Sequence, residues 1–107
     1  MSAQRSLEWS PRALAVYDRF IDELSTANPI AAEEFNDEVF ERLSMVLTFP
    51  NLYRESSRVA GVREMVVRPN YFIVYRLTRT KVRILNFEHT RRNWPKPPRP
   101  STVRRRK

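Results

Sequence analysis

The stretch GVREMVVRPNYFIVYRLTRTKVRILNFEHTRRNWP, residues 61–95, predicts three consecutive β-strands. Val62–Val67, Tyr71–Leu77 and Lys81–His89 are rich in the β-branched and aromatic residues that favour strands. Pro69-Asn70 separates the first two as a tight turn, because proline presets the first central position and asparagine tolerates the second. Short turns between strands indicate an antiparallel meander, in which Tyr71–Leu77 is the central strand.

The last of these strands ends in a polar cluster, HTRRNW, residues 89–94, which contains the only histidine of the chain. Side chains alternate between the two faces of a strand. We therefore expect one face to carry Arg83, Leu85, Phe87 and His89, and the other to carry Val82, Ile84, Asn86 and Glu88. A polar cluster at the end of an ordered strand can supply either chemistry or a binding surface.

Two amphipathic helices are expected upstream of the meander. Ser10-Pro11 is a helix start, because serine caps free amide groups and proline fits the first helical position; this helix should run to about Ser25. Asn28-Pro29 interrupts it, since the residue before a proline avoids the helical region, and a second helix should cover residues 30–47. Residues 5–9 are expected to form a short N-terminal strand.

This order of elements predicts an α+β fold: an N-terminal strand, an antiparallel two-helix hairpin, and then a three-stranded antiparallel meander. Both helices should cover one face of the sheet and leave the other partly open. The chain has 107 residues, which suits a single domain with one core. We assign residues 1–95 to this domain and residues 96–107 to a basic tail rich in proline and arginine.

The net charge of +8 is unevenly distributed along the chain. Residues 95–107 contain six basic residues and no acid, so the rest of the chain carries only +2. Of the 20 basic residues, 17 are arginine, whose planar donor fork suits phosphates and carboxylates. The composition favours an acidic partner, either nucleic acid or an acidic protein segment. The alternative is that the tail is a solvated charge run.

Composition also limits the kinds of site that we expect. The chain has no cysteine and one histidine, so disulfides and thiolate metal sites are excluded, and we expect no metal and no cofactor. The N-terminal segment lacks a long apolar run, so we expect neither a signal peptide nor a membrane span. The absence of cysteine fits a reducing cytoplasm.

Four motifs together resemble the RelE/ParE family of bacterial toxins, the toxin halves of type II toxin–antitoxin modules. They are WSPRAL at the start of a helix, the NP break, GVREMVV-RPNYFIVYRL, and ILNFEHTRRNWP. The combination of G-x-R-E, PNY-x-x-VYR and a strand that ends in H-x-R-x-x-W carries the resemblance, which covers about residues 5–95. The family's fold, a helical hairpin on an antiparallel sheet, agrees with the order of elements expected here.

The resemblance implies one of two activities. RelE-like members are ribosome-dependent endoribonucleases that cut messenger RNA, whereas ParE-like members, often labelled plasmid stabilisation proteins, poison DNA gyrase. Both inhibit growth and are silenced by a cognate antitoxin, whose acidic, flexible segment wraps the toxin into a hetero-oligomer. The implied partners are therefore an antitoxin and either gyrase or the ribosome with its mRNA.

A nuclease needs groups that activate the ribose hydroxyl, stabilise the phosphate and protonate the leaving oxygen. His89 could act as general acid or base, because its ordinary pKa lies near neutrality. Arg63, Arg76 and Arg91 could hold the phosphate. In the alternative interpretation His89 is structural and hydrogen-bonds Trp94 or a backbone carbonyl.

Two departures from the nuclease pattern favour the ParE branch, in which the protein acts by binding rather than by catalysis. RNA-cleaving relatives usually carry a basic residue where this chain has Tyr71-Phe72-Ile73, and many carry a tyrosine within the segment that here reads His89–Trp94. The residues that we expect to bind the target or the antitoxin are Arg63, Arg83, His89, Arg91, Arg92 and Trp94. A third hypothesis is a nucleic-acid-binding module driven by the tail.

Overall fold

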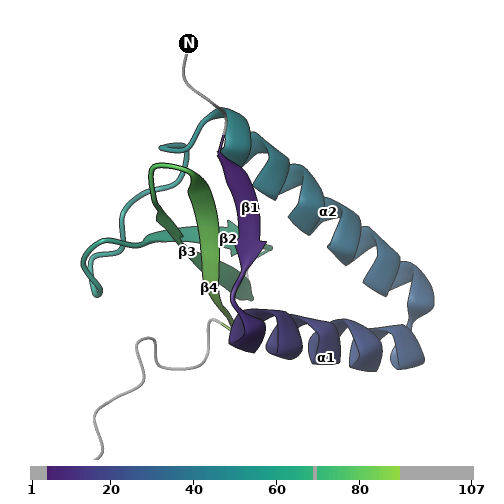
Figure 1. The fold of residues 1–107 in the computed structure, drawn as a ribbon. Helices are drawn as coiled ribbons and strands as arrows, with labels where there is room; N and C mark the ends of the chain where they lie inside the picture. The colour runs from purple at the N-terminus through teal and green to yellow at the C-terminus, as the bar shows by residue number, and fades with distance from the viewer. Residues whose placement is uncertain (1–4, 69, 90–107) are drawn as a thin grey trace, which may run out of the picture.

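The computed structural model describes residues 5–68 and 70–89, and it confirms the α+β class (Figure 1). Its elements are the strand β1 (Ser6–Trp9), the helices α1 (Pro11–Ala27) and α2 (Pro29–Thr48), and the strands β2 (Arg63–Val67), β3 (Tyr71–Leu77) and β4 (Lys81–His89). Both helices extend slightly further than expected. Among the described residues, no helix is both long and apolar enough to cross a membrane.

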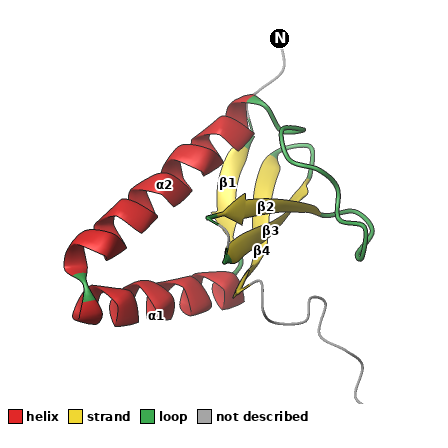
Figure 2. Cartoon of the chain, turned by 180° about the vertical axis from the view of Figure 1, so that it is seen from behind, coloured by secondary structure: helices red, strands yellow, loops and turns green. Residues whose placement is uncertain are grey.

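The two helices meet at Asn28, which caps both of them. Its backbone N–H donates to the carbonyl of Leu24 at 2.7 Å, which closes α1, and its side-chain oxygen accepts from the amide of Ala31 at 3.1 Å, which opens α2. Ser10 caps the start of α1 in the same way, accepting from Ala13 at 3.1 Å. From this single-residue joint the helices diverge as a V (Figure 2).

The sheet has four strands in the order β1-β4-β3-β2. The meander β2-β3-β4 is antiparallel as expected, and β3 lies inside the sheet. The N-terminal strand β1 pairs in parallel with β4, with Ser6 opposite Lys81 and Trp9 opposite Ile84. The sheet is therefore mixed rather than purely antiparallel, because the helical hairpin returns the chain so that β4 runs beside β1 in the same direction.

A bulge in β4 overturns the expected alternation of its side chains. Val74 lies opposite Asn86 and Tyr75 lies opposite Ile84, so Leu85 is the extra residue. Ile84 and Phe87 consequently both belong to the core beneath the helices, whereas Leu85 packs on the other face. The expectation that Arg83 and Phe87 share a face is wrong, and beyond the bulge the odd-numbered residues face the helices.

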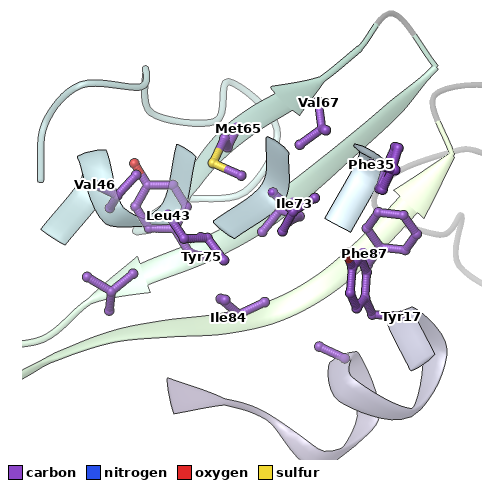
Figure 3. Close-up of a cluster of buried hydrophobic side chains, with 13 residues drawn as sticks. Tyr17, Phe35, Leu43, Val46, Met65, Val67, Ile73, Tyr75, Ile84 and Phe87 are labelled. Carbon is purple, nitrogen blue, oxygen red and sulfur yellow. The ribbon is translucent and has the colours of Figure 1, made fainter. Parts of the chain in front are cut away.

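The main core fills the space between the V of the helices and one face of the sheet (Figure 3). Its aliphatic part includes Leu43, Val46, Met65, Ile73 and Ile84, and its aromatic part consists of Tyr17, Phe35, Tyr75 and Phe87. Full burial of one such side chain stabilises the fold by about 1.5–3 kcal/mol. The core therefore holds both helices on one face of the sheet, as expected.

The opposite face, which we expected to be partly open, is partly covered by the loop between α2 and β2. Val62 in this loop packs with Phe72 and Val74 in a second buried cluster. The amide of Ser56 donates to the carbonyl of Val62 at 2.8 Å, so the loop folds back on itself. Gly61 permits this return because its φ is +84°, a left-handed angle that glycine adopts at little cost.

Candidate functional site

Helix α1 borders two surface grooves of about 500 Å³ each, one on either side of the helix. The α1–β4 groove lies between α1 and the end of β4, and its lining includes Arg12, Arg19, Phe20, Tyr71, Phe87 and His89. The α1–α2 groove lies between the two helices beside β1, and its lining includes Trp9, Leu14, Tyr17, Asp18, Glu33 and Phe40. Both are described here as candidate binding surfaces.

The α1–β4 groove contains the predicted residue His89 above an aromatic floor. The centroid of the His89 ring lies 4.8 Å from that of Tyr71, and the two rings meet edge to face. Tyr71 stacks on Phe87 at 5.6 Å with an interplanar angle of 5°, and Phe20 packs against both rings. This packing fixes one end of β4 against α1 and orients the imidazole.

Two arginines of α1 border the same groove. Arg12 and Arg19 are seven residues apart, which is two helical turns and about 10 Å along the axis. Both are exposed, and neither forms an ion pair with another residue of the described chain. The acids Glu23 and Glu88 also line the groove. Together with the aromatic floor, this arrangement suits a partner that has both an apolar face and carboxylates or phosphates.

The structure does not bring the other described candidates to His89. Arg63 is engaged elsewhere: it donates to the carbonyl of Tyr53 at 2.7 Å and lies 3.5 Å from a carboxylate oxygen of Glu55. Its side chain is only 19% exposed, and it lies opposite Tyr75, whose pKa is raised to about 12 by burial although Arg63 opposes this shift. Arg63 therefore holds the loop against β2.

Arg76 and Arg83 lie opposite each other on β3 and β4, far from His89. His89 pairs with Tyr71, and five residues of extended strand between Tyr71 and Arg76 span about 17 Å. Arg83 lies 3.3 Å from a carboxylate oxygen of Glu8. The remaining candidates, Arg91, Arg92 and Trp94, lie outside the described residues.

Sequence reasoning missed Arg12 and Arg19 as site residues, although a signal was present. Arg12, Ala15, Val16, Arg19 and Glu23 follow the spacing i, i+3, i+4, i+7, i+11, which places them on one face of a helix. Because only the apolar stripe of this helix was examined for a role, and that role was core packing, the arginine-bearing face received none.

A third surface lies at the edge of the sheet, beside β2. Val66 is 51% exposed and lines a shallow groove that Leu52, Arg54 and Arg68 also border. Edge strands present backbone groups that an added strand can pair with. Exposed apolar side chains next to arginines make this edge suitable for an acidic, extended protein segment.

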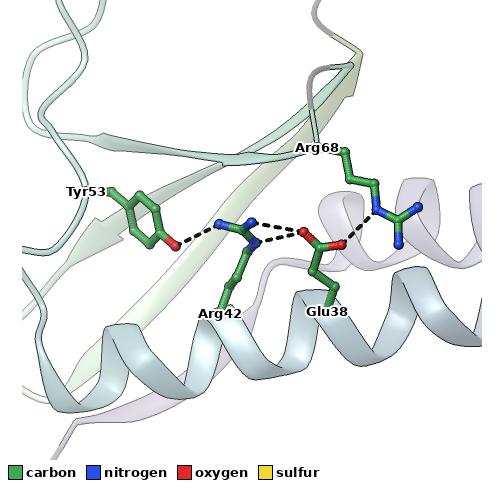
Figure 4. Close-up of polar contacts among 4 residues, drawn as sticks. All are labelled: Glu38, Arg42, Tyr53 and Arg68. Atoms are coloured by element: carbon green, nitrogen blue, oxygen red, sulfur yellow. Dashed lines mark hydrogen bonds and ion pairs between the residues drawn. The ribbon is translucent and has the colours of Figure 1, made fainter.

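Glu38 ties this edge to α2 (Figure 4). One carboxylate oxygen lies 2.7 Å from Nε of Arg68, and the other lies 3.0 Å from Arg42, which also donates to the hydroxyl of Tyr53 at 3.3 Å. The hydrogen bond from Arg68, followed by that from Arg42, holds the pKa of Glu38 below its ordinary value, although burial opposes this. Arg68 adopts a left-handed φ of 61° and lies over the ring of Phe35.

Within residues 5–68 and 70–89, no three His, Cys, Asp or Glu side chains gather as a metal site would require. The polar groups in the grooves are therefore described as protein-binding or catalytic candidates.

Comparison with known proteins identifies the fold and the family. A family model described as "ParE toxin of type II toxin-antitoxin system, parDE" matches residues 7–94. A solved structure, the chromosomal ParDE TA system from P. aeruginosa, superposes with a TM-score of 0.68 at 21% identity, covering 80% of this chain and 96% of that one. That likeness concerns the fold. No curated protein matches the chain.

Proposed function

The chain belongs to the ParE toxin family of type II toxin–antitoxin systems, and from this premise we propose that it inhibits growth in the cytoplasm by binding a protein target. DNA gyrase is the first candidate target, as the resemblance to ParE-like toxins implies. A cognate antitoxin with an acidic segment neutralises the toxin in a hetero-oligomer. A role in plasmid stabilisation would follow from such a module.

The α1–β4 groove is the observation that supports binding over catalysis. His89 shares this groove with aromatic rings and with Arg12 and Arg19, while Arg63 and Arg76 are occupied or distant. A surface with a fixed apolar floor and arginines at its rim resembles the centre of a protein interface, where aromatic residues and arginine are enriched. We assign target binding to this groove.

The edge at β2 is the surface that we assign to the antitoxin. Val66 and Leu52 offer apolar contacts, and Arg54 and Arg68 offer donors for carboxylates. An acidic segment that adds a strand at this edge gains backbone hydrogen bonds as well as ion pairs. Because such a segment is ordered on binding, part of the interaction free energy offsets lost entropy.

A supercoiling assay tests the target. Purified protein added to DNA gyrase should inhibit supercoiling, and Arg12→Glu combined with Arg19→Glu should relieve that inhibition. Arg79→Glu, an exposed charge reversal in the turn between β3 and β4, is the matched control and should retain inhibition. If gyrase stays fully active at saturating concentrations of the toxin, gyrase is not the target.

A co-expression experiment tests the module itself. Induction of this chain alone should arrest growth, and co-expression of a neighbouring open reading frame that encodes a small acidic protein should restore it. Growth that continues after induction of folded protein would contradict the toxin assignment for this chain.

A RelE-like, ribosome-dependent endoribonuclease is the second candidate, because an imidazole and two guanidiniums share one groove. In this mechanism His89 transfers the proton while Arg12 and Arg19 bind phosphate. Translating ribosomes mixed with the protein should then yield codon-phased cuts that His89→Ala abolishes. Intact mRNA in cells whose growth is arrested would exclude this mechanism.

A further inference from the structure

The α1–α2 groove exposes apolar surface that no described element covers. Leu14 is 42% exposed and Phe40 is 49% exposed, and both line the groove. At its base the rings of Trp9 and Tyr17 lie 5.1 Å apart, and the Tyr17 hydroxyl donates to the side chain of Asn36 at 2.8 Å. The floor is therefore aromatic and fixed, as in grooves that bind extended segments.

The charged residues that line this groove, Asp18 and Glu33, are both acids. They belong to an acidic layer, because α1 and α2 together contain eight acids and three arginines. The described residues as a whole contain twelve basic and twelve acidic residues. All of the net charge of +8 therefore resides in residues 90–107, which contain eight basic residues and no acid.

Residues 95–100, PKPPRP, combine basic charge with four prolines. This segment follows the stretch that the family model matches, residues 7–94. Proline favours the extended polyproline II conformation, which loses little entropy when it binds. Aromatic-lined grooves recognise such segments, and acids beside the groove can pair with their basic residues.

The chain can reach this groove from the end of β4. His89 lies in the α1–β4 groove, on the other side of α1, and a helix with its side chains is about 10–12 Å across. Five extended residues, 90–94, span up to about 17 Å. The nearer α1–β4 groove contains Arg12 and Arg19, which repel a basic segment. We propose that residues 95–100 bind in the α1–α2 groove of their own chain.

This inference is independent of the cellular target, and the absence of cysteine makes it directly testable. A single Ser101→Cys substitution carries a nitroxide label in the full chain. If the tail binds as proposed, backbone amide signals of Leu14 and Phe40 lose most of their NMR intensity, while that of Val66, at the far edge of the sheet, is retained. Equal intensity at all three positions would overturn the proposal.

Two pairs of substitutions separate the groove from general attraction to the helices. Asp18→Asn with Glu33→Gln should restore the signals of Leu14 and Phe40, because both acids line the groove. Asp22→Asn with Glu34→Gln removes the same charge from the same helices outside the groove and should leave the broadening in place. Equal restoration by both pairs would overturn the groove as the binding site.

Two further measurements test the fit and the stoichiometry. Replacing Pro97 and Pro98 by alanine keeps the charge and should weaken the broadening; an undiminished effect would overturn recognition of a polyproline conformation. Mixing isotope-labelled, spin-free chain with spin-labelled chain detects contacts between copies. Broadening that is confined to the mixed sample would mean that the tail binds a second copy, which also overturns the proposal.

Discussion

The two grooves that flank α1 share a helix but differ in charge. The α1–β4 groove places Arg12 and Arg19 above a stacked aromatic floor, with acids also present. The α1–α2 groove has an equally aromatic floor, but its charged residues are the acids Asp18 and Glu33. The comparison teaches that successive residues of one helix, turned by the helical repeat, can present surfaces suited to partners of opposite charge.

The largest expected effect comes from Phe87, which joins the aromatic rings beneath the two grooves. Its ring lies 5.1 Å from Tyr17 on the α1–α2 side and 5.6 Å from Tyr71 on the α1–β4 side. Phe87→Ala should lower the free energy of unfolding by about 3–5 kcal/mol, measured by urea denaturation.

Phe49→Ala is the control for this prediction, because Phe49 is 55% exposed. It should change the free energy of unfolding by no more than about 0.5 kcal/mol. If both substitutions destabilise the protein equally, the aromatic cluster is not the shared support of the grooves.

A second prediction separates the antitoxin surface from both grooves. Val66→Glu adds an acid to the exposed edge at β2, where it should repel an acidic antitoxin segment and weaken binding about tenfold, which is about 1.4 kcal/mol. Isothermal titration with the purified antitoxin measures this, and growth arrest by the toxin alone should persist. Unchanged affinity would place the antitoxin elsewhere, with the α1–β4 groove as the next surface to test.

A third prediction concerns Glu38, which ties α2 to the edge outside both grooves. Its pKa is lowered in the folded state, so its contribution is present above the ordinary glutamate value of about 4.3. It is lost as the pH falls through the lower folded value.

Glu38→Gln should therefore lower stability by about 1 kcal/mol at pH 7 and flatten the loss of stability in acid. Thermal unfolding between neutral and acidic pH measures both effects. Glu41→Gln, one turn of α2 away, is the control and should retain the wild-type pH dependence. A steep acid loss that survives Glu38→Gln would show that other carboxylates control acid unfolding.

The smallest expected effect is that of Arg83, a residue for which the sequence predicted a binding role. The Arg83–Glu8 pair is exposed on both sides, and such pairs contribute about 0.2–1 kcal/mol. Arg83→Ala should therefore change stability little and leave growth arrest intact, since Arg83 lies far along β4 from His89. Loss of toxicity in this variant would extend the functional surface beyond the α1–β4 groove.

Local signals in the sequence predicted most of the fold. Ser10-Pro11 and Asn28-Pro29 located both helix starts, and the ranges expected for β3 and β4 match the structure. The parallel pairing of β1 with β4 was not predicted, because it depends on where the hairpin returns the chain. The bulge at Leu85 was missed for a similar reason, since no glycine or proline marks it.

The same limits explain what the sequence revealed about the candidate site. His89 was identified from residue type and position, which local reasoning can use. Its neighbours Arg12 and Arg19 come from α1, some seventy residues earlier in the chain, so only tertiary packing brings them to it. Arg63 and Arg76 were grouped with His89 because they are close in sequence, although the strands separate them.

One comparison of variants tests the central claim, that the α1–β4 groove acts by binding rather than by His89 chemistry. Growth after induction is measured for His89→Gln and for Arg12→Glu combined with Arg19→Glu, at matched levels of folded protein. The account predicts that His89→Gln still arrests growth and that the double arginine reversal does not. Growth arrest that is lost in His89→Gln but retained in the arginine reversal would contradict it.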